Sequence, residues 1–174
     1  MNKKRLKNIL SNLLMIVIII VAFYVYLKYD YNYFSKGISE KGRTEFSRDS
    51  NVKYSKDRSY KIENKVSNDA MFYREVTVRK NTPYRVTCMV RTENVVGNEN
   101  DTMAGAQICL NGTDEHSNVI QGNTNWTKIE FLFNSKNNEK VEIGFRLGGI
   151  SNTAEGTAWF SDFTIEEGST GESN

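Results

Sequence analysis

The sequence predicts an all-β fold, an antiparallel β-sandwich preceded by one N-terminal transmembrane helix. Short runs rich in β-branched and aromatic residues recur from residue 59 onward, separated by turns rich in Asn and Gly. No helical period of useful length follows residue 34, while a long apolar run precedes it. The chain has 174 residues, enough for one ordinary domain with some additions.

The N-terminal apolar run is typical of a membrane-spanning helix. Residues 9–27 read ILSNLLMIVIIIVAFYVYL, with Ser11 and Asn12 as the only polar members. About 19 residues with a rise of about 1.5 Å each give roughly 28 Å, close to a hydrocarbon core of about 30 Å. Two alternatives stay open, a cleaved signal peptide and a buried core helix. The run ends in bulky tyrosines and lacks a small-residue cleavage pattern, which favours an uncleaved anchor.

Charge predicts the orientation of this anchor. The first eight residues carry a basic cluster, which the positive-inside rule keeps in the cytoplasm: Lys3, Lys4, Arg5 and Lys7. We therefore expect a single-pass protein of the cell membrane, with a cytoplasmic segment at 1–8, the lipid bilayer as a partner of residues 9–27, and an extracellular domain. The net charge is only +2 and the basic excess is local, so nothing favours a nucleic-acid partner.

The outer part reads as one β domain. Residues 28–43 are expected to form a juxtamembrane stalk, residues 44–167 the sandwich, and residues 168–174 a flexible tail or linker. Short strand-like pieces stand near Thr44–Phe46 and Val52–Tyr54, and a polar loop is expected over Thr92–Met103. The predicted strands are Ser59–Glu63, Met71–Val78, Tyr84–Arg91, Ala104–Leu110, Trp126–Asn134, Val141–Leu147 and Ala158–Ile165.

Alternation along these strands assigns their faces and bears on the cysteines. Tyr84, Val86, Cys88 and Val90 form an apolar face for the core between the sheets. Cys109, by contrast, falls on the polar face of its own strand. Cross-strand partners share a face, so this pattern favours two free thiols. A disulfide, which would need a bulge or a register slip, stays open as the alternative.

Several segments, taken in order, carry a resemblance to a known family. They include KNTPYRVTCMVRTENV, NTNWTKIEFLFNS and GTAWFSDFTIEEG. Over residues 44–167 the chain resembles a carbohydrate-binding module of the CenC-like type, within the galactose-binding-like jelly-roll superfamily. The resemblance implies a jelly-roll sandwich that binds a polysaccharide or cell-surface glycan.

The same resemblance implies a structural calcium ion. In similar modules an aspartate in the last strand helps to bind calcium, and Asp162 stands at that place here. Glu45 or Asp49 would assist it, with backbone oxygens near residues 57–59 completing the oxygen shell that calcium prefers. The alternative is an aspartate that is solvated or caps a turn.

The ligand candidates are the polar residues that face away from the core. Planar guanidinium and amide groups bond pairs of sugar hydroxyls, and an adjacent Tyr73 or Phe72 would supply stacking. The expected set is Tyr73, Arg85, Arg91, Gln107, Glu142 and Arg146. A hydrated face with ordinary ion pairs is the alternative. The loop Val95–Met103 is a second candidate region. Trp126 and Trp159 are expected to pack in the core, as tryptophans do in similar modules.

The predicted function is non-catalytic glycan binding or tethering at the cell surface. An envelope module that serves a structural or protein-interaction role is the alternative. A small glycan-active enzyme would need two carboxylates in one cleft, about 5 to 9.5 Å apart, and no sequence pair forces that arrangement. Two cysteines and one histidine, His116, which is expected to be solvated, exclude a zinc ribbon or a Cys–His cluster made by this chain alone.

Overall fold

The computed structural model describes residues 11–22, 34–38, 43–56, 58–98 and 102–168. The chain divides into two compact units, Met1–Tyr33 and Phe34–Asn174. In the first unit, residues 11–22 are helical. Among the described residues no helix is long and apolar enough to cross a membrane. Residues 9–10 and 23–27 of the expected span, the basic segment at 1–8, and residues 169–174 lie outside the described residues.

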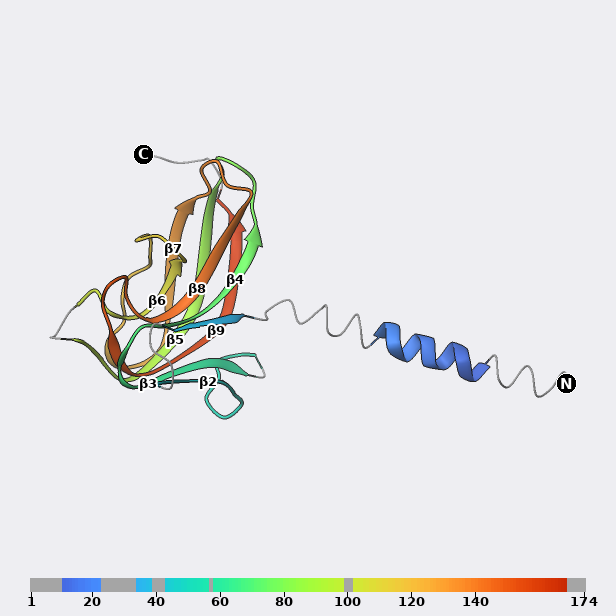
Figure 1. Cartoon of the computed structure of the whole chain (residues 1–174), viewed down its shortest axis with the longest axis horizontal. Helices are drawn as coiled ribbons and strands as arrows, with labels where there is room; N and C mark the ends of the chain where they lie inside the picture. Colours follow the sequence, from blue (N-terminus) through green and yellow to red (C-terminus); the bar gives the residue numbers. More distant parts are fainter. Residues whose placement is uncertain (1–10, 23–33, 39–42, 57, 99–101, 169–174) are drawn as a thin grey trace, which may run out of the picture. The chain divides into compact units, whose positions relative to one another are not determined.

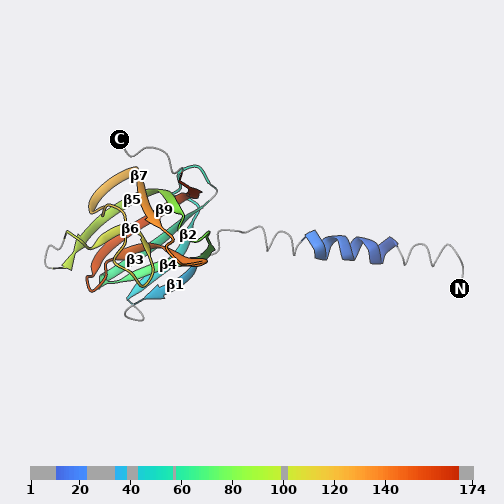
Figure 2. The ribbon, with the colours of Figure 1, turned by 90° about the horizontal axis from the view of Figure 1, so that it is seen from above.

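The second unit is a sandwich of two antiparallel sheets (Figures 1 and 2). The four-stranded sheet has the order β1 (Ser35–Ile38), β4 (Ala70–Thr77), β8 (Lys140–Gly148) and β6 (Gly105–Leu110). The five-stranded sheet has the order β2 (Thr44–Asp49), β3 (Ser59–Asn68), β9 (Ala154–Glu167), β5 (Pro83–Gly97) and β7 (Gly122–Asn134). The predicted antiparallel β-sandwich is therefore confirmed.

Alternating side chains from both sheets fill the core. The face predicted for β5 is buried, because Tyr84, Val86, Cys88 and Val90 are each at most 8% exposed. Between the sheets, the rings of Phe145 from β8 and Phe160 from β9 stack with centroids 5.1 Å apart. Burying such a side chain contributes about 1.5–3 kcal/mol, so this core stabilises the sandwich mainly through its apolar area.

Two central strands are longer than the sequence predicts. β5 continues from Arg91 to Gly97, and β9 begins at Ala154 rather than Ala158. The two strands pair along this added length, with a register shift between Glu93 and Val96, so that Asn94 and Val95 form a bulge. The predicted strand-like piece at Val52–Tyr54 lies outside the strands.

The sandwich also begins earlier than predicted. β1 lies inside the range expected for the stalk, yet it pairs with β4 from Ser35 opposite Tyr73. The Phe34 side chain is 2% exposed, and its ring packs 4.5 Å from Phe145 and 5.0 Å from Tyr60. The stalk prediction is wrong for residues 34–38, because a single aromatic residue in a polar stretch supplies a core contact that no periodicity reveals.

Both cysteines are free and buried, as expected. Cys88 lies in the core on the five-stranded sheet, whereas Cys109 lies in the four-stranded sheet with its sulfur 3.6 Å from that of Met71. Burial raises the pKa of the Cys88 thiol, and burial raises that of Cys109 to about 11. His116 forms a β-bridge with Cys109 and is half-buried, so it is less exposed to solvent than the sequence predicts.

A buried amide joins the two sheets at one end of the sandwich. Asn64 of β3 is 2% exposed. Its Nδ2 lies within hydrogen-bonding distance of the carbonyl oxygens of Asn68, Leu147 and Ala154, at 3.0, 3.1 and 2.9 Å. Its Oδ1 accepts a bond of 2.6 Å from the hydroxyl of Thr44. Leu147 belongs to the four-stranded sheet and Ala154 to the five-stranded sheet, so one side chain bonds across the sandwich.

Replacing this amide should destabilise the domain strongly. We expect Asn64→Ala to lower the free energy of unfolding by about 3 kcal/mol, because buried carbonyls lose their donor and a cavity remains. Urea denaturation of the variant and of Asn118→Ala, an exposed control, measures the effect. Equal stabilities of the two variants would contradict this account of Asn64.

Candidate functional site

The six predicted ligand residues lie on two opposite faces. Tyr73, Gln107, Glu142 and Arg146 belong to the four-stranded sheet, whereas Arg85 and Arg91 of β5 belong to the five-stranded sheet. The prediction that they share one polar face is therefore wrong. The reason is that alternation defines the two faces of each strand but not which strands are neighbours.

The residues on the four-stranded sheet bond mainly to the protein itself. Arg146 donates two hydrogen bonds to Asp69, of 2.7 and 2.6 Å, and its side chain is only 11% exposed. Gln107 is 2% exposed and donates to the carbonyl of Gly148 over 2.7 Å. Glu142 accepts a bond of 2.6 Å from the Asn111 side chain. These bonds commit Arg146 and Glu142 to partners within the protein, whereas the buried Oε1 of Gln107 has no hydrogen-bond partner among the described residues.

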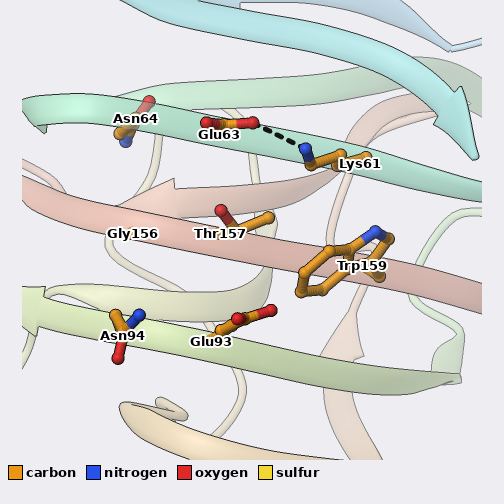
Figure 3. Close-up of a pocket in the computed structure, with 8 residues that line it drawn as sticks. All are labelled: Lys61, Glu63, Asn64, Glu93, Asn94, Gly156, Thr157 and Trp159. Atoms are coloured by element: carbon orange, nitrogen blue, oxygen red, sulfur yellow. Dashed lines mark hydrogen bonds and ion pairs between the residues drawn. The ribbon is translucent and has the colours of Figure 1, made fainter. Parts of the chain in front are cut away.

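A pocket of about 260 Å³ lies on the outer face of the five-stranded sheet. Figure 3 shows that β3, β9 and β5 run side by side beneath it and that residues from all three strands line it. Its lining consists of Lys61, Glu63, Asn64, Glu93, Asn94, Gly156, Thr157 and Trp159. Of these eight, Asn64 is committed to the buried network described above.

Strand register places the lining residues in two rows across the sheet. Thr157 of β9 pairs with Glu63 on one side and with Glu93 on the other. Two residues along β9, Trp159 pairs with Lys61 and with Arg91. Ala158 and Phe160 alternate with these positions and point into the core, so the period of two in β9 directs Thr157 and Trp159 outward.

Trp159 is held firmly in the floor of the pocket. Its indole nitrogen donates a hydrogen bond of 2.9 Å to Asp49 at the end of β2. The Lys61 ammonium lies 5.7 Å and the Arg91 guanidinium carbon 5.4 Å from its ring, both within cation–π range. The side chain is 5% exposed, so the indole shapes the pocket more than it offers an open stacking surface.

The two glutamates of the pocket differ in their surroundings. Glu63 forms an ion pair with Lys61, with 2.6 Å between Oε2 and Nζ, while Glu93 is exposed to solvent. They stand on strands two spacings apart, roughly 9.6 Å between backbones. Glu63 faces the Lys61 ammonium and Glu93 faces solvent, so both carboxylates present hydrogen-bond acceptors at the pocket.

One end of the pocket depends on a glycine. Gly156 has a φ of +113°, a backbone conformation that residues other than glycine rarely adopt. A Cβ added at this position would collide with the backbone of Asn94. This close approach brings Asn94 of β5 against β9. Asn94 itself has a φ of +51°, and its backbone N–H donates to the side chain of Asn123 over 2.8 Å. The bulged end of β5 thus forms a defined wall.

The two tryptophans do not occupy the core between the sheets. Trp159 is buried, as expected, but it packs on the outer face of the five-stranded sheet. Trp126 is half-buried, with its ring 5.9 Å from that of Tyr54. The second candidate region, Val95–Met103, is divided by the structure, since Val95–Gly97 belong to β5 and residues 99–101 lie outside the described residues.

The residues predicted to bind calcium are separated. Asp162 adopts a φ of +54° and accepts hydrogen bonds from Ser55 at 2.5 Å and Ser161 at 3.2 Å. Glu45 forms an ion pair with Lys65 and pairs with Glu63, which in turn pairs with Thr157 of β9. Thr157 is five residues from Asp162 along that strand. Five residues of strand span roughly 16 Å, so Glu45 and Asp162 do not share one ion.

Asp49 also has its own partners. Besides Trp159, it accepts hydrogen bonds from the backbone nitrogens of Asn51 and Val52, at 2.8 and 3.0 Å. Within the ranges that the structure describes, no group of three or more His, Cys, Asp or Glu side chains could hold a metal ion. Residue 57, near the expected backbone ligands, lies outside those ranges. A calcium ion held by Asp162 and Asp49 stays a prediction.

Sequence reasoning did not single out most of the pocket. None of the eight lining residues came from the predicted ligand set, although Arg91 of that set packs on Trp159 beside the pocket. In the strand SYKIE the alternation places Lys61 on the face opposite to the buried Ile62. This alternation could have identified Lys61 as a residue of the outer face. Glu93 and Asn94 fell in an expected loop, and only the pairing of β5 with β9 places them beside Thr157.

Three solved structures are similar to this chain and establish its fold class. TmCBM61, in complex with β-1,4-galactotriose, matches with a TM-score of 0.51 and 16% identity, over 79% of this chain and 90% of its own. The CBM22-1 and GH10 modules of Clostridium thermocellum xylanase 10B, complexed with xylohexaose, match with a TM-score of 0.51 and 12% identity, over 78% of this chain. The enzymatically active domain of tailspike protein 4 from bacteriophage CBA120 matches with a TM-score of 0.56 and 11% identity, also over 78%.

The chain has the jelly-roll fold of carbohydrate-binding modules, which confirms the predicted resemblance at the level of the fold. It spans 19% of the tailspike chain and 26% of the xylanase chain, so it corresponds to one module of those larger proteins. The sequence matches no protein-family model and no curated protein.

The Asp49 carboxylate should make stability depend on pH. Partial burial opposes its ionisation, but hydrogen bonds from Val52, Trp159 and Asn51 outweigh burial and lower the pKa of Asp49. A lowered folded-state pKa adds stability above the unfolded pKa, and this stability is lost as the pH falls through the folded pKa.

We therefore expect Asp49→Asn to be less stable than wild type at neutral pH, with a difference that shrinks below about pH 4. Urea denaturation across a pH series measures it, with Asp114→Asn as the exposed control. A difference that stays constant with pH would show that the carboxylate charge is not what matters at this position.

Proposed function

We propose that this chain binds a glycan without catalysing a reaction, and that the ligand occupies the pocket beside Trp159. The observation that carries the proposal is the pocket itself, a polar hollow on the outer face of a sheet in a domain with the fold of carbohydrate-binding modules. The similar structures TmCBM61 and xylanase 10B hold a β-1,4-galactotriose and a xylohexaose. Their low identity limits the likeness to the fold, so the ligand class rests on the chemistry of the pocket.

The pocket offers the groups that bind neutral sugars. Glu93 and Glu63 present carboxylate oxygens that accept hydrogen bonds from hydroxyls, and Thr157 places a hydroxyl between them. Lys61 of the lining pairs with Glu63, and Arg91, which packs on Trp159 beside the pocket, is a second cation near Glu93, so a neutral ligand suits the pocket better than a charged one. A volume of about 260 Å³ is below the usual range of about 300–1,000 Å³ for ligand pockets, which favours a single sugar ring.

We further propose that residues 9–27 anchor the chain in the cell membrane, with the domain outside the cell. The apolar length and the basic N-terminal flank support this arrangement. Anchoring would hold the sugar pocket at the cell surface, where a weakly bound polymer is retained by a high local concentration of sites.

Binding can be tested on the full chain in detergent, using calorimetry and affinity electrophoresis with β-glucans, xylans, mannans, galactans and peptidoglycan fragments. We expect saturable binding that Glu93→Ala weakens on the order of tenfold, because an exposed acceptor is lost without damage to the core. Tyr73→Ala, on the opposite face, is the matched control and should bind as wild type does.

The variants separate the possible sites. Loss of binding in Tyr73→Ala with retention in Glu93→Ala would move the site to the four-stranded sheet. A folded protein that binds none of these glycans would exclude the proposed function for them. A fragment starting at residue 36 should not be used, because it removes Phe34 from the core.

The anchor is tested separately in cells that express the full chain. We expect the protein to stay in the membrane pellet after alkaline extraction, and the domain to be digested by protease added to intact cells. A variant lacking residues 9–27 should leave the pellet. Release of the wild-type domain as a shorter soluble form would instead indicate a cleaved signal peptide.

A further inference from the structure

The sandwich has one sheet edge unlike the others. The edge strands β1, β2 and β6 have 4, 6 and 6 residues, whereas β7 has 13. The outer side of β6 is also covered, because Ile120 and Ser117 bond to its backbone at Ala106 and Ile108 over 2.8–3.0 Å. Among the described strands β7 pairs only with β5, so its other side presents backbone groups without a strand partner.

This edge is regular and has few of the usual protective features. Residues 127–134 pair with residues 83–90 without a register shift. The side chains that point inward are Ile129, Phe131 and Phe133, all at most 5% exposed, so no charge enters the sandwich at this edge. Sheet edges that must stay single are usually short, bulged, interrupted by proline, or provided with charged side chains or an inward charge. Of these devices the regular part of β7 carries only outward charges, Lys128 and Glu130.

The outward side chains of β7 make it complementary to itself. The outer face presents Lys128, Glu130 and Leu132, and Leu132 is 61% exposed. Two identical antiparallel strands related by a two-fold axis pair residues at equal distances on either side of that axis. With the axis at Ile129, Lys128 of each copy lies opposite Glu130 of the other, which gives two opposite-charge pairs.

The neighbouring registers lack this complementarity. An axis at Lys128 or at Glu130 would place two like charges directly opposite each other, and an axis at Phe131 would place Glu130 opposite Leu132. Only the axis at Ile129 matches the charges, and it also brings Leu132 opposite Trp126 of the second copy. Within the described residues of its own chain Glu130 forms one ion pair, with Arg85 at 3.5 Å, but that pair is exposed and weak.

We propose that two copies of this chain associate through β7, by antiparallel pairing of β7 with β7 centred on Ile129. The five-stranded sheets then join into one continuous sheet across the interface. The pocket near Trp159 lies two strands away on β9 and stays uncovered. The proposal does not depend on glycan binding.

Charge exchange tests this register in the full chain in detergent, with the mass measured by sedimentation. We expect wild type to be dimeric, and Lys128→Glu or Glu130→Lys to weaken association on the order of tenfold or more, because each creates two like-charge contacts. The double variant should dimerise again, and so should an equimolar mixture of the two single variants. Lys140→Glu, which disrupts an exposed pair with Glu75 on the other sheet, is the matched control.

A cross-link distinguishes β7 pairing from association through the apolar N-terminal segment. Mixing Lys128→Cys and Glu130→Cys chains should give a disulfide-linked heterodimer under mild oxidation, since directly paired strand residues lie within disulfide range. The two native cysteines are buried and should contribute little. A monomeric wild type, a Lys128→Glu chain that dimerises as wild type does, or no heterodimer cross-link would each overturn the proposal.

Discussion

The carboxamide of Asn64 is the constraint on which the rest of the sandwich depends. Its nitrogen lies within bonding distance of carbonyls at the end of β3, in β8 and in β9, while its oxygen accepts from Thr44 of β2. Buried carbonyls need donors, so sliding any of these strands by one residue would leave several of them unpaired. Apolar contacts between the two sheets are not directional, so they would stabilise many alignments of one sheet on the other. This polar network selects one of them.

The position of the pocket follows from that alignment. Lys61 and Glu63 stand within three residues of Asn64 on β3, so fixing the height of Asn64 against β9 also fixes them opposite Trp159 and Thr157. The other wall comes from β5, whose bulged end is brought close by the missing side chain of Gly156. Asp49 then holds the indole from the end of β2. A site assembled from four strands is rigid because each strand is already ordered by the core.

Sequence reasoning reached the fold class and the faces of the strands because both depend on local periodicity. The alternation from Tyr84 to Val90 is a property of one strand, and the structure confirms it. The grouping of strands into sheets depends on long-range pairing, which alternation does not encode, and for that reason Arg85 and Gln107 were wrongly placed together. A loop is predicted at Thr92–Asn94 because these residues are polar and the bulge after Glu93 interrupts the alternation of apolar and polar residues in β5. Phe34 is a single buried aromatic residue and gives no periodic signal.

The pocket and the proposed interface lie on one sheet, and their geometry has a consequence for binding. A two-fold axis perpendicular to the joined sheets keeps both outer faces on the same side. From β9 to its counterpart there are five strand spacings, roughly 24 Å across the sheet. The pocket also lies at least three residues from Ile129 along β7, so the two-fold axis adds roughly 20 Å along the strands and puts the two pockets roughly 30 Å or more apart. If the chain binds a glycan as proposed, a single extended polymer of several sugar rings would span that distance, with one ring in each pocket of about 260 Å³. Two such pockets facing the same way would gain affinity by holding one polymer at two points, without a new contact in either pocket.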